Sequence, residues 1–164
     1  KILVDKIQVD ESNIDNWHSS IAHVPQNVFI YDDTIRNNII NSSMNGIVDE
    51  AKYQDVIIQS ELSEFINNLP DGDLTIVGER GAKISGGQKQ RIGIARALYK
   101  DAQIFFFDEI TSSLDQETEK NIINSIKKIN HLGKTILMIS HKLSVLDICD
   151  NIYEFENKKI TKIK

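Results

Sequence analysis

The sequence is poor in the residues that mark several classes of protein. It has one cysteine among 164 residues, Cys149, so no disulfide can form within the chain and a disulfide-stapled fold is excluded. No apolar run is long enough to span a bilayer, and the first residues do not have the pattern of a signal peptide. We therefore expect any membrane role to come through a partner.

Charge of either sign is also dispersed. The net charge is −5 and no block of five like charges occurs, so nucleic acid is not favoured as a partner. Hydrophobic residues make up 40% of the chain and charged residues 26%, which is ordinary for a globular protein of about one domain. The chain starts at Lys1 rather than at a Met, and we expect it to be part of a longer polypeptide.

Apolar runs that end in polar residues predict a parallel sheet. Residues 104–107 and 135–139 are continuous apolar runs, as expected for strands that are buried on both faces. A helix is predicted from Ser85 onward, and a second one is predicted between Asp115 and Gly133. Strand and helix thus alternate from residue 84, which predicts the α/β class.

The other predicted elements are short. We expect strands at 2–4, 6–9, 21–24 and 74–77, helices at 13–19, 34–40 and 143–148, a helical stretch from 49 to 66, a polar loop at 41–46, a glycine-bounded loop at 78–81 and a hairpin at 152–155 and 158–163.

A Ser-Gly-Gly turn opens the first of the long helices. Ser85 and Gln88 have the spacing of a capping box, in which each side chain bonds to the other residue's backbone. Gly86 and Gly87 are poor helix formers, and their cost is understandable if something must approach the backbone closely. A helix N-terminus of this kind can bind an anion. The other reading, an ordinary capped helix, stays open on these residues alone.

Polar side chains follow the predicted buried strands. Asp108 and Glu109 come directly after residues 104–107, and adjacent acids there are costly unless they have partners or a role. One carboxylate can hold Mg²⁺ beside phosphates, and the other can orient or deprotonate a water. His141 ends the next strand and so lies at the same edge of the sheet, where ligands gather. The alternative for the acid pair is a solvated loop.

Other candidates have weaker support from the sequence. Gln26 follows a strand and a proline, and Asp115 is in the first place a helix cap. Asp115 also shares a loop with Ser112 and Ser113 that can face a ligand or a neighbour. We interpret His18, His23 and His131 as structural. Gly133-Lys134-Thr135 is not a P-loop, because position 128 is Lys instead of Gly and a strand follows. No P-loop occurs in the sequence.

Together these segments resemble the nucleotide-binding domain of ATP-binding cassette (ABC) transporters. Residues 84–88 resemble the family signature Leu-Ser-Gly-Gly-Gln, with Ile84 in place of Leu. Residues 104–109 resemble the Walker B strand with its catalytic Glu, and residues 112–115 resemble the D-loop. His141 resembles the switch His and Gln26 the Q-loop Gln.

The resemblance extends to the exporter subtype. Residues 24–29, 34–39 and 77–81 are similar to exporter-type domains, in which a membrane half is usually fused upstream. The chain departs from the family pattern at three further positions, with Ile76 in place of Glu and Ile110 and Ser113 in place of Ala.

The resemblance implies a P-loop NTPase-like α/β fold with a mostly parallel sheet. Residues 1–164 then form the C-terminal part of one ABC ATPase domain, with a helical subdomain at about 41–98. This fold places the missing Walker A strand between the strand at 135–139 and the hairpin, so we expect a gap or open sheet edge there, closed by local re-pairing or by another chain. Because the P-loop and the adenine-stacking aromatic are lacking, we expect the chain alone not to bind or hydrolyse ATP appreciably.

For the intact protein the resemblance implies ATP and Mg²⁺ at the interface of a head-to-tail pair of domains. Asp108 would hold Mg²⁺ through water and Glu109 would be the general base. His141 would contact the γ-phosphate, and Gln26 would sense metal and water. A transmembrane domain would be the second partner, at the cytoplasmic face of the inner or plasma membrane.

The remaining site residues would serve the ATP of the partner domain. They are Ser85, Gly86, Gly87, Gln88 and Asp115. Two other functions stay open: a non-transport ABC ATPase that works on nucleic acid, and a purely structural or interaction fragment. The acidic charge and the exporter-like segments argue against the first.

Overall fold

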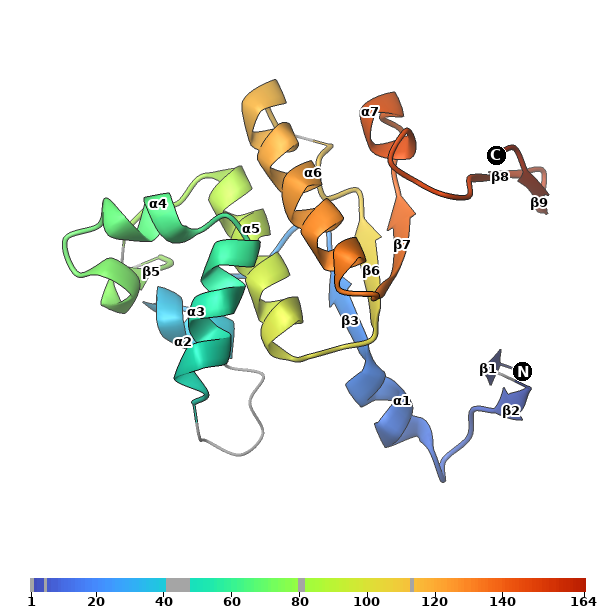
Figure 1. Cartoon of the computed structure of the whole chain (residues 1–164), viewed down its shortest axis with the longest axis horizontal. Helices are drawn as coiled ribbons and strands as arrows, with labels where there is room; N and C mark the ends of the chain where they lie inside the picture. The colour runs from blue at the N-terminus through green and yellow to red at the C-terminus, as the bar shows by residue number, and fades with distance from the viewer. Residues whose placement is uncertain (1, 5, 41–47, 80–81, 113) are drawn as a thin grey trace.

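A parallel three-stranded sheet organises the chain (Figure 1). The computed structural model describes residues 2–4, 6–40, 48–79, 82–112 and 114–164. In the sheet, β6 (Ile104–Asp108) lies between β3 (Ile21–Val24) and β7 (Thr135–Ile139). The register aligns Val24 with Phe107 and Asp108 with Ile139, so the three strands end at one edge. The predicted parallel sheet is confirmed.

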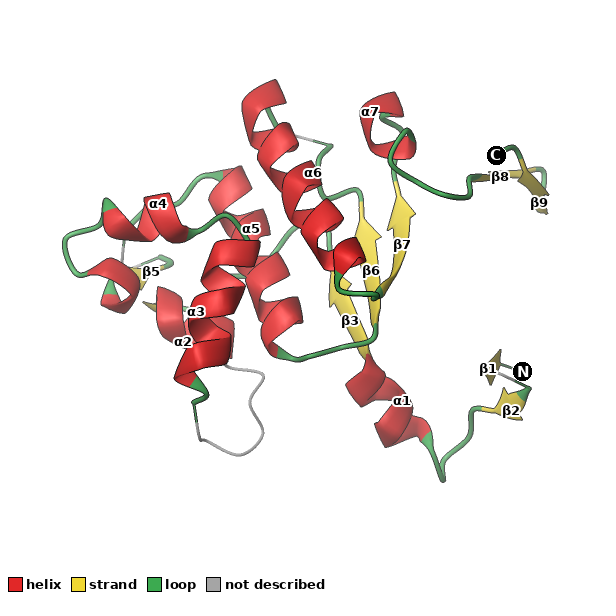
Figure 2. Ribbon diagram, viewed as in Figure 1, coloured by secondary structure: helices red, strands yellow, loops and turns green. Residues whose placement is uncertain are grey.

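Two long helices, α5 (Gly86–Tyr99) and α6 (Gln116–His131), cover one face of this sheet (Figure 2). Phe105 and Phe107 point to that side and are almost completely buried. An apolar stripe of α6 joins the same core, with Ile122, Ile126 and Ile129 buried at helical spacing. This packing fixes the sheet edge relative to the N-terminus of α5.

The prediction that both runs are buried on two faces is wrong for this chain. Burial alternates along β6, with Phe106 only half-buried, and along β7, where Leu137 is 54% and Ile139 57% exposed. Side chains alternate across a strand, so one set meets the helices and the other faces the open side of the sheet. The continuous apolar runs therefore predicted the strands correctly. They did not show that, among the described residues, only one face of the sheet is covered.

A smaller, mainly helical region packs against α5. It contains β4 (Asp33–Thr34), α2 (Ile35–Ile40), α3 (Glu50–Gln59), α4 (Ser63–Asn67), a 3₁₀ turn at Gly72–Leu74 and β5 (Ile76–Val77), and β4 pairs with β5 antiparallel. Tyr53 and Leu62 are buried in its core. That residues 41–98 form one subdomain stays a prediction.

Two sequence expectations need correction in this region. The helical stretch from Asp49 is two helices, because Glu61 has a left-handed backbone with φ of 58° between them. The extended segment 74–77 is shorter than expected, since Leu74 closes the 3₁₀ turn. The predicted polar loop at 41–46, part of the loop at 78–81 and Ser113 lie outside the described residues.

Short elements lie toward the two ends of the chain. They are the pair β1 (Leu3–Val4) and β2 (Ile7–Gln8), the helix α1 (Ile14–Ser20), the short helix α7 (Leu143–Leu146) and the hairpin of β8 (Tyr153–Glu156) and β9 (Lys159–Lys162). The hairpin does not join the central sheet, and β7 pairs only with β6 among the described strands. The open edge that was expected beside residues 135–139 is therefore present in this part of the structure.

Candidate active site

The acid pair lies where β6 ends. Asp108 is the last residue of the strand, and Glu109 turns the chain with a φ of 46°. A left-handed backbone at a non-glycine residue is strained, and such strain often occurs at functional sites. Two hydrogen bonds hold Glu109: its N–H donates to the Ile139 carbonyl at 3.0 Å, and its carbonyl accepts from the Ser112 N–H at 3.0 Å.

The Glu109 carboxylate is the centre of a side-chain cluster. Its Oε1 lies 3.1 Å from Nε2 of His141, and its Oε2 accepts from Nε2 of Gln26 at 3.2 Å. The same Gln26 amide donates to Oγ of Ser112 at 2.9 Å. Glu109 is mostly shielded while the His141 side chain is 87% exposed, so the cluster is open to solvent through the imidazole. The structure thus brings together three residues that were predicted from separate segments.

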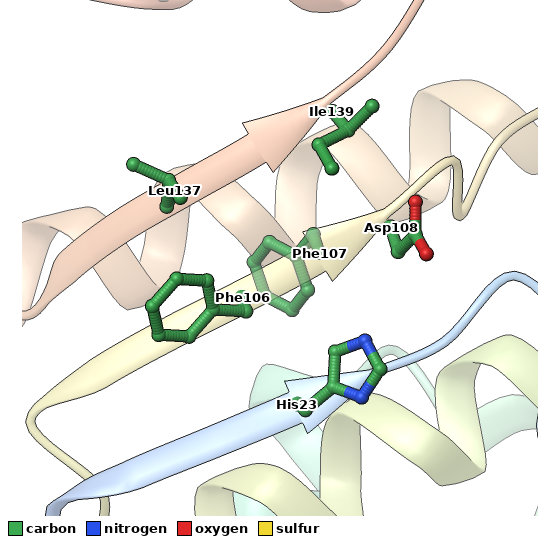
Figure 3. Close-up of a pocket in the computed structure, with 6 residues that line it drawn as sticks. All are labelled: His23, Phe106, Phe107, Asp108, Leu137 and Ile139. Atoms are coloured by element: carbon green, nitrogen blue, oxygen red, sulfur yellow. The ribbon is translucent and has the colours of Figure 1, made fainter.

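Asp108 faces a different space from Glu109. It lines a shallow hollow of about 260 Å³ on the open face of the sheet, together with His23, Leu137 and Ile139 (Figure 3). Sequence reasoning left His23 as structural. Its register opposite Phe106 on the neighbouring strand is the signal that places it in this hollow.

The residues present fit an Mg²⁺ site that is completed by substrate phosphates and water, not one made by protein side chains alone. Among the described residues no group of three or more His, Cys, Asp or Glu could hold a metal alone. Mg²⁺ is usually bound by one or two carboxylates together with substrate phosphates and water. Asp108 has the chemistry for such a single carboxylate, and the Gln26 amide oxygen is a second possible donor.

The Ser-Gly-Gly turn has the predicted capping box. Ser85 Oγ accepts from the Gln88 N–H at 3.2 Å, and Gln88 Oε1 accepts from the Ser85 N–H at 2.7 Å. These bonds satisfy two of the backbone donors at the start of α5. Gly86 is exposed at this end of the helix.

The surroundings of the two glycines in the turn differ, so a side chain would be tolerated differently at each. A Cβ at Gly87 would lie 2.1 Å from Cγ2 of Thr118 on α6, so a side chain there would collide within the same chain. A Cβ at Gly86 would meet only Leu114 Cδ2, at an ordinary 3.7 Å. We inferred from the sequence that something approaches the backbone of both glycines closely. At Gly87 the structure shows what this is, since α6 packs against α5 there. Ligand contact at either glycine stays a prediction.

Asp115 is the N-cap of α6, as predicted. It accepts from the backbone N–H of Thr118 at 3.0 Å and of Glu117 at 3.1 Å, and from the Thr118 hydroxyl at 2.7 Å. These bonds, those from Thr118 first, hold the pKa of Asp115 below its usual value. No hydrogen bond of the described residues joins Ser85, Gln88 or Asp115 to the Gln26–Glu109–His141 cluster, so the site residues fall into two groups.

Sequence reasoning missed two side chains that support the cluster. Lys142 follows His141 and donates through Nζ to the Thr111 carbonyl at 2.7 Å and to Glu119. Gln90 is buried on α5 and donates to the Gln26 carbonyl. The signal for Gln90 was its place one turn inside α5, on the face that packs on the sheet.

This arrangement defines a class. A parallel sheet with an acid pair, a His and a Gln at its carboxyl edge, beside a helix that starts at a capped Ser-Gly-Gly turn, is an α/β fold of the P-loop NTPase-like kind. The model of the ABC transporter family matches residues 1–112, more than half of the chain. The chain belongs to that family.

Known relatives are a flippase and a transporter by name. The chain is 40% identical over 161 residues to the ATP-dependent lipid A-core flippase of Saccharophagus degradans. The aligned region covers 98% of this chain and 27% of that protein. It is 41% identical over 157 residues to the mitochondrial iron-sulfur clusters transporter ATM1 of Candida glabrata. That alignment covers 95% of this chain and 21% of the transporter.

A solved structure agrees with the fold. A bacterial Atm1-family ABC exporter with ATP bound matches 97% of this chain and 28% of its own length, with a TM-score of 0.84 and 32% identity. The chain spans about a quarter of the length of these relatives. Within the described residues, no helix is both long and apolar enough to cross a membrane.

Proposed function

We propose that this chain is the C-terminal part of a nucleotide-binding domain that powers an ABC exporter. The observation that carries the proposal is the meeting of Gln26, Glu109 and His141 at the carboxyl edge of the sheet. In such a site an attacking water needs a base and fixed polar groups around it. The relatives' names favour an exporter over a nucleic-acid machine.

In this proposal the cluster acts on the ATP of its own domain. Glu109 is the general base, and its contacts with Gln26 and His141 orient its carboxylate toward the attacking water. His141 contacts the γ-phosphate through its exposed ring. Asp108 would hold Mg²⁺, and Gln26 would respond to the metal and to the attacking water. When bound, Mg²⁺ neutralises the charge that develops on the phosphates.

The capped turn serves a second ATP. Ser85, Gly86, Gly87 and Gln88 form a helix N-terminus with a positive dipole end, suited to a γ-phosphate held by a partner domain. Asp115 lies on the same interface. The partners are therefore a second nucleotide-binding domain, arranged head-to-tail, and a transmembrane domain at the cytoplasmic face of the membrane.

The chain alone supplies only part of one site. The phosphate cradle and lysine of a P-loop are not in the sequence, so we propose that ATP binding and hydrolysis need the residues that precede Lys1 in the intact protein. A P-loop preceded by several apolar spans in those residues would support an exporter. A P-loop flanked by long coiled-coil heptads would favour the nucleic-acid alternative.

The histidines provide a matched test. In the intact protein, His141→Ala should lower ATP turnover by at least about tenfold, since a polar contact made in the transition state is removed. His131→Ala is the control, because His131 lies in the last turn of α6, where its Nδ1 is 2.7 Å from the Lys127 carbonyl oxygen. Equal turnover of the two variants would contradict the proposed site.

A further inference from the structure

Gln90 is a buried polar side chain that the proposed mechanism leaves unused. It lies on α5, past the capped turn, and is 5% exposed. Its Nε2 lies 2.5 Å from the carbonyl oxygen of Gln26 and 3.4 Å from that of Pro25. Its Oε1 is buried without a hydrogen-bond partner among the described residues. An apolar side chain would avoid this unpaired oxygen, so the amide needs another reason to be there.

The orientation of the Gln90 amide follows from its neighbours. Two carbonyl oxygens face it, and only the NH₂ end of an amide can donate to them. The flipped amide would set oxygen against oxygen. The side chain is therefore a donor that hydrogen-bonds to the backbone of residues 25 and 26.

The same face of α5 contacts the rest of this loop. Residues 90, 93 and 96 are spaced by three and so lie on one side of the helix. A Cβ at Gly93 would lie 2.7 Å from Cγ2 of Val28, and Arg96 Nη1 donates to the Phe29 carbonyl at 3.0 Å. The backbone from Pro25 to Phe29 is thus held against α5 from end to end, and Gln90 holds the end that carries Gln26.

Gln26 links the hydrogen bonds of Gln90 to the candidate active site. Its backbone carbonyl is bound by Gln90, while its side-chain amide donates to Glu109 and Ser112. A shift of the Gln26 backbone would therefore move the amide away from the carboxylate. A misplacement of about 1 Å at such a contact can lower a rate by about 10²-fold.

We propose that Gln90 is a positioning residue that fixes the backbone of Gln26, so that the Gln26 amide meets Glu109. The proposal rests on the function proposed above, since it gives Gln90 a role only through that site. It also joins the start of α5, which faces the partner's ATP in that proposal, to the cluster that acts on the chain's own ATP. A displacement of the capped turn would then be transmitted to Gln26.

The decisive variant is Gln90→Met in the intact protein. Methionine has nearly the length of glutamine but no donor. We expect kcat for ATP hydrolysis to fall about tenfold or more, while KM for ATP changes by less than about threefold, because the affected contact orients groups around the water. In a Gln26→Ala background the same change should lower kcat by less than about twofold, since the residue through which it acts is gone.

Arg91→Met is the matched control on the same helix. Arg91 Nη1 donates to the Glu61 carbonyl at 2.7 Å, outside the loop that carries Gln26. Its loss should lower the Tm but leave kcat within about twofold of the wild type. Gln90→Leu, similar in volume and also without a donor, replaces Gln90→Met if that variant does not fold.

Two results would overturn the role of Gln90. One is an unchanged kcat in Gln90→Met, and the other is an equal loss of kcat with and without Gln26. In either case, low activity of Glu109→Gln and Gln26→Ala would leave the proposed function standing. Full activity of those two variants would instead refute the proposed function, and the role of Gln90 with it.

Discussion

Oε1 of Glu109 lies 3.1 Å from Nε2 of His141, although the two residues are supplied by different strands. Glu109 follows β6 and His141 follows β7, and the parallel register that pairs Asp108 with Ile139 brings both strand ends to one edge. The backbone bond from the Glu109 N–H to the Ile139 carbonyl fixes the turn that aims the carboxylate. The contact is thus a consequence of strand register.

Glu109→Gln should stop turnover in the intact protein but permit ATP-driven association. The amide has the shape of the carboxylate and can still bond to its neighbours, but it cannot accept the proton of water. We expect turnover to fall by about 10²-fold or more, as for loss of a general base. The measurements are steady-state ATP hydrolysis and the oligomeric state with and without ATP.

Glu154→Gln is the control for this change, because Glu154 is exposed on the β8–β9 hairpin. It should turn over ATP like the wild type. Undiminished turnover by Glu109→Gln would refute Glu109 as the base.

The 164-residue polypeptide alone should not bind ATP with micromolar affinity. Its sequence contains no P-loop, whose backbone amides and lysine form the main phosphate cradle. Calorimetric titration with ATP and Mg²⁺ should show no saturation below about 1 mM, a standard free energy weaker than about −4 kcal/mol. A longer polypeptide that includes the upstream residues should bind, and micromolar binding by the short one would sink the prediction.

Much of the candidate site followed from patterns that are local in the sequence. The capping box of Ser85 and Gln88 was predicted from their spacing, and Asp115 from its place before a helix. Glu109 and His141 were predicted to share an edge because parallel strands end together. These predictions succeeded because each depends on one element or on one rule of sheet topology.

The rest depended on contacts between distant segments, which a single sequence does not reveal. Phe106 and Leu137 belong to apolar runs, yet half of each strand faces the open side of the sheet. Nothing near Gly87 in the sequence shows that Thr118 lies against it. Gln90 was also missed, because its role depends on where the Gln26 backbone passes α5.

Gly87→Ala should destabilise the fold through a clash with α6. The new Cβ would lie 2.1 Å from Thr118 Cγ2, so either the two helices must move apart or Thr118 must rotate and lose its bond to Asp115. Overpacking of this kind costs about 1–3 kcal/mol. Thermal or urea unfolding of the variant measures the change.

Two variants separate this clash from the intrinsic effect of alanine. Gly86→Ala, where the Cβ meets Leu114 at 3.7 Å, should change stability by less than about 1 kcal/mol and can even stabilise the helix. Adding Thr118→Ser to Gly87→Ala removes Cγ2 but keeps the hydroxyl that bonds to Asp115, and should restore most of the loss. If Gly86→Ala and Gly87→Ala were equally stable, the packing argument would be wrong.

The ion pair of Glu119 and Lys142 should make part of the stability depend on acid pH. The side-chain hydrogen bond from Lys142, with a second from Ser144, lowers the pKa of Glu119 below its usual 4.5. A carboxyl with a lowered pKa in the folded state adds stability that is complete above its unfolded pKa and is lost as the pH falls through its folded pKa. The Tm should therefore decline from about pH 5 downward.

Glu119→Gln should make that decline shallower, because the variant has no carboxylate to protonate at this position. Some slope should remain, since the pKa of Asp115 is lowered as well. Glu154→Gln, on the exposed hairpin, is the matched control and should keep the wild-type slope. Thermal unfolding between pH 3.5 and 7 measures all three proteins, and an unchanged slope in Glu119→Gln would show that the pair does not contribute. Because Lys142 also bonds to the Thr111 carbonyl and follows His141, loss of the pair should loosen the segment that carries the imidazole before the sheet itself unfolds.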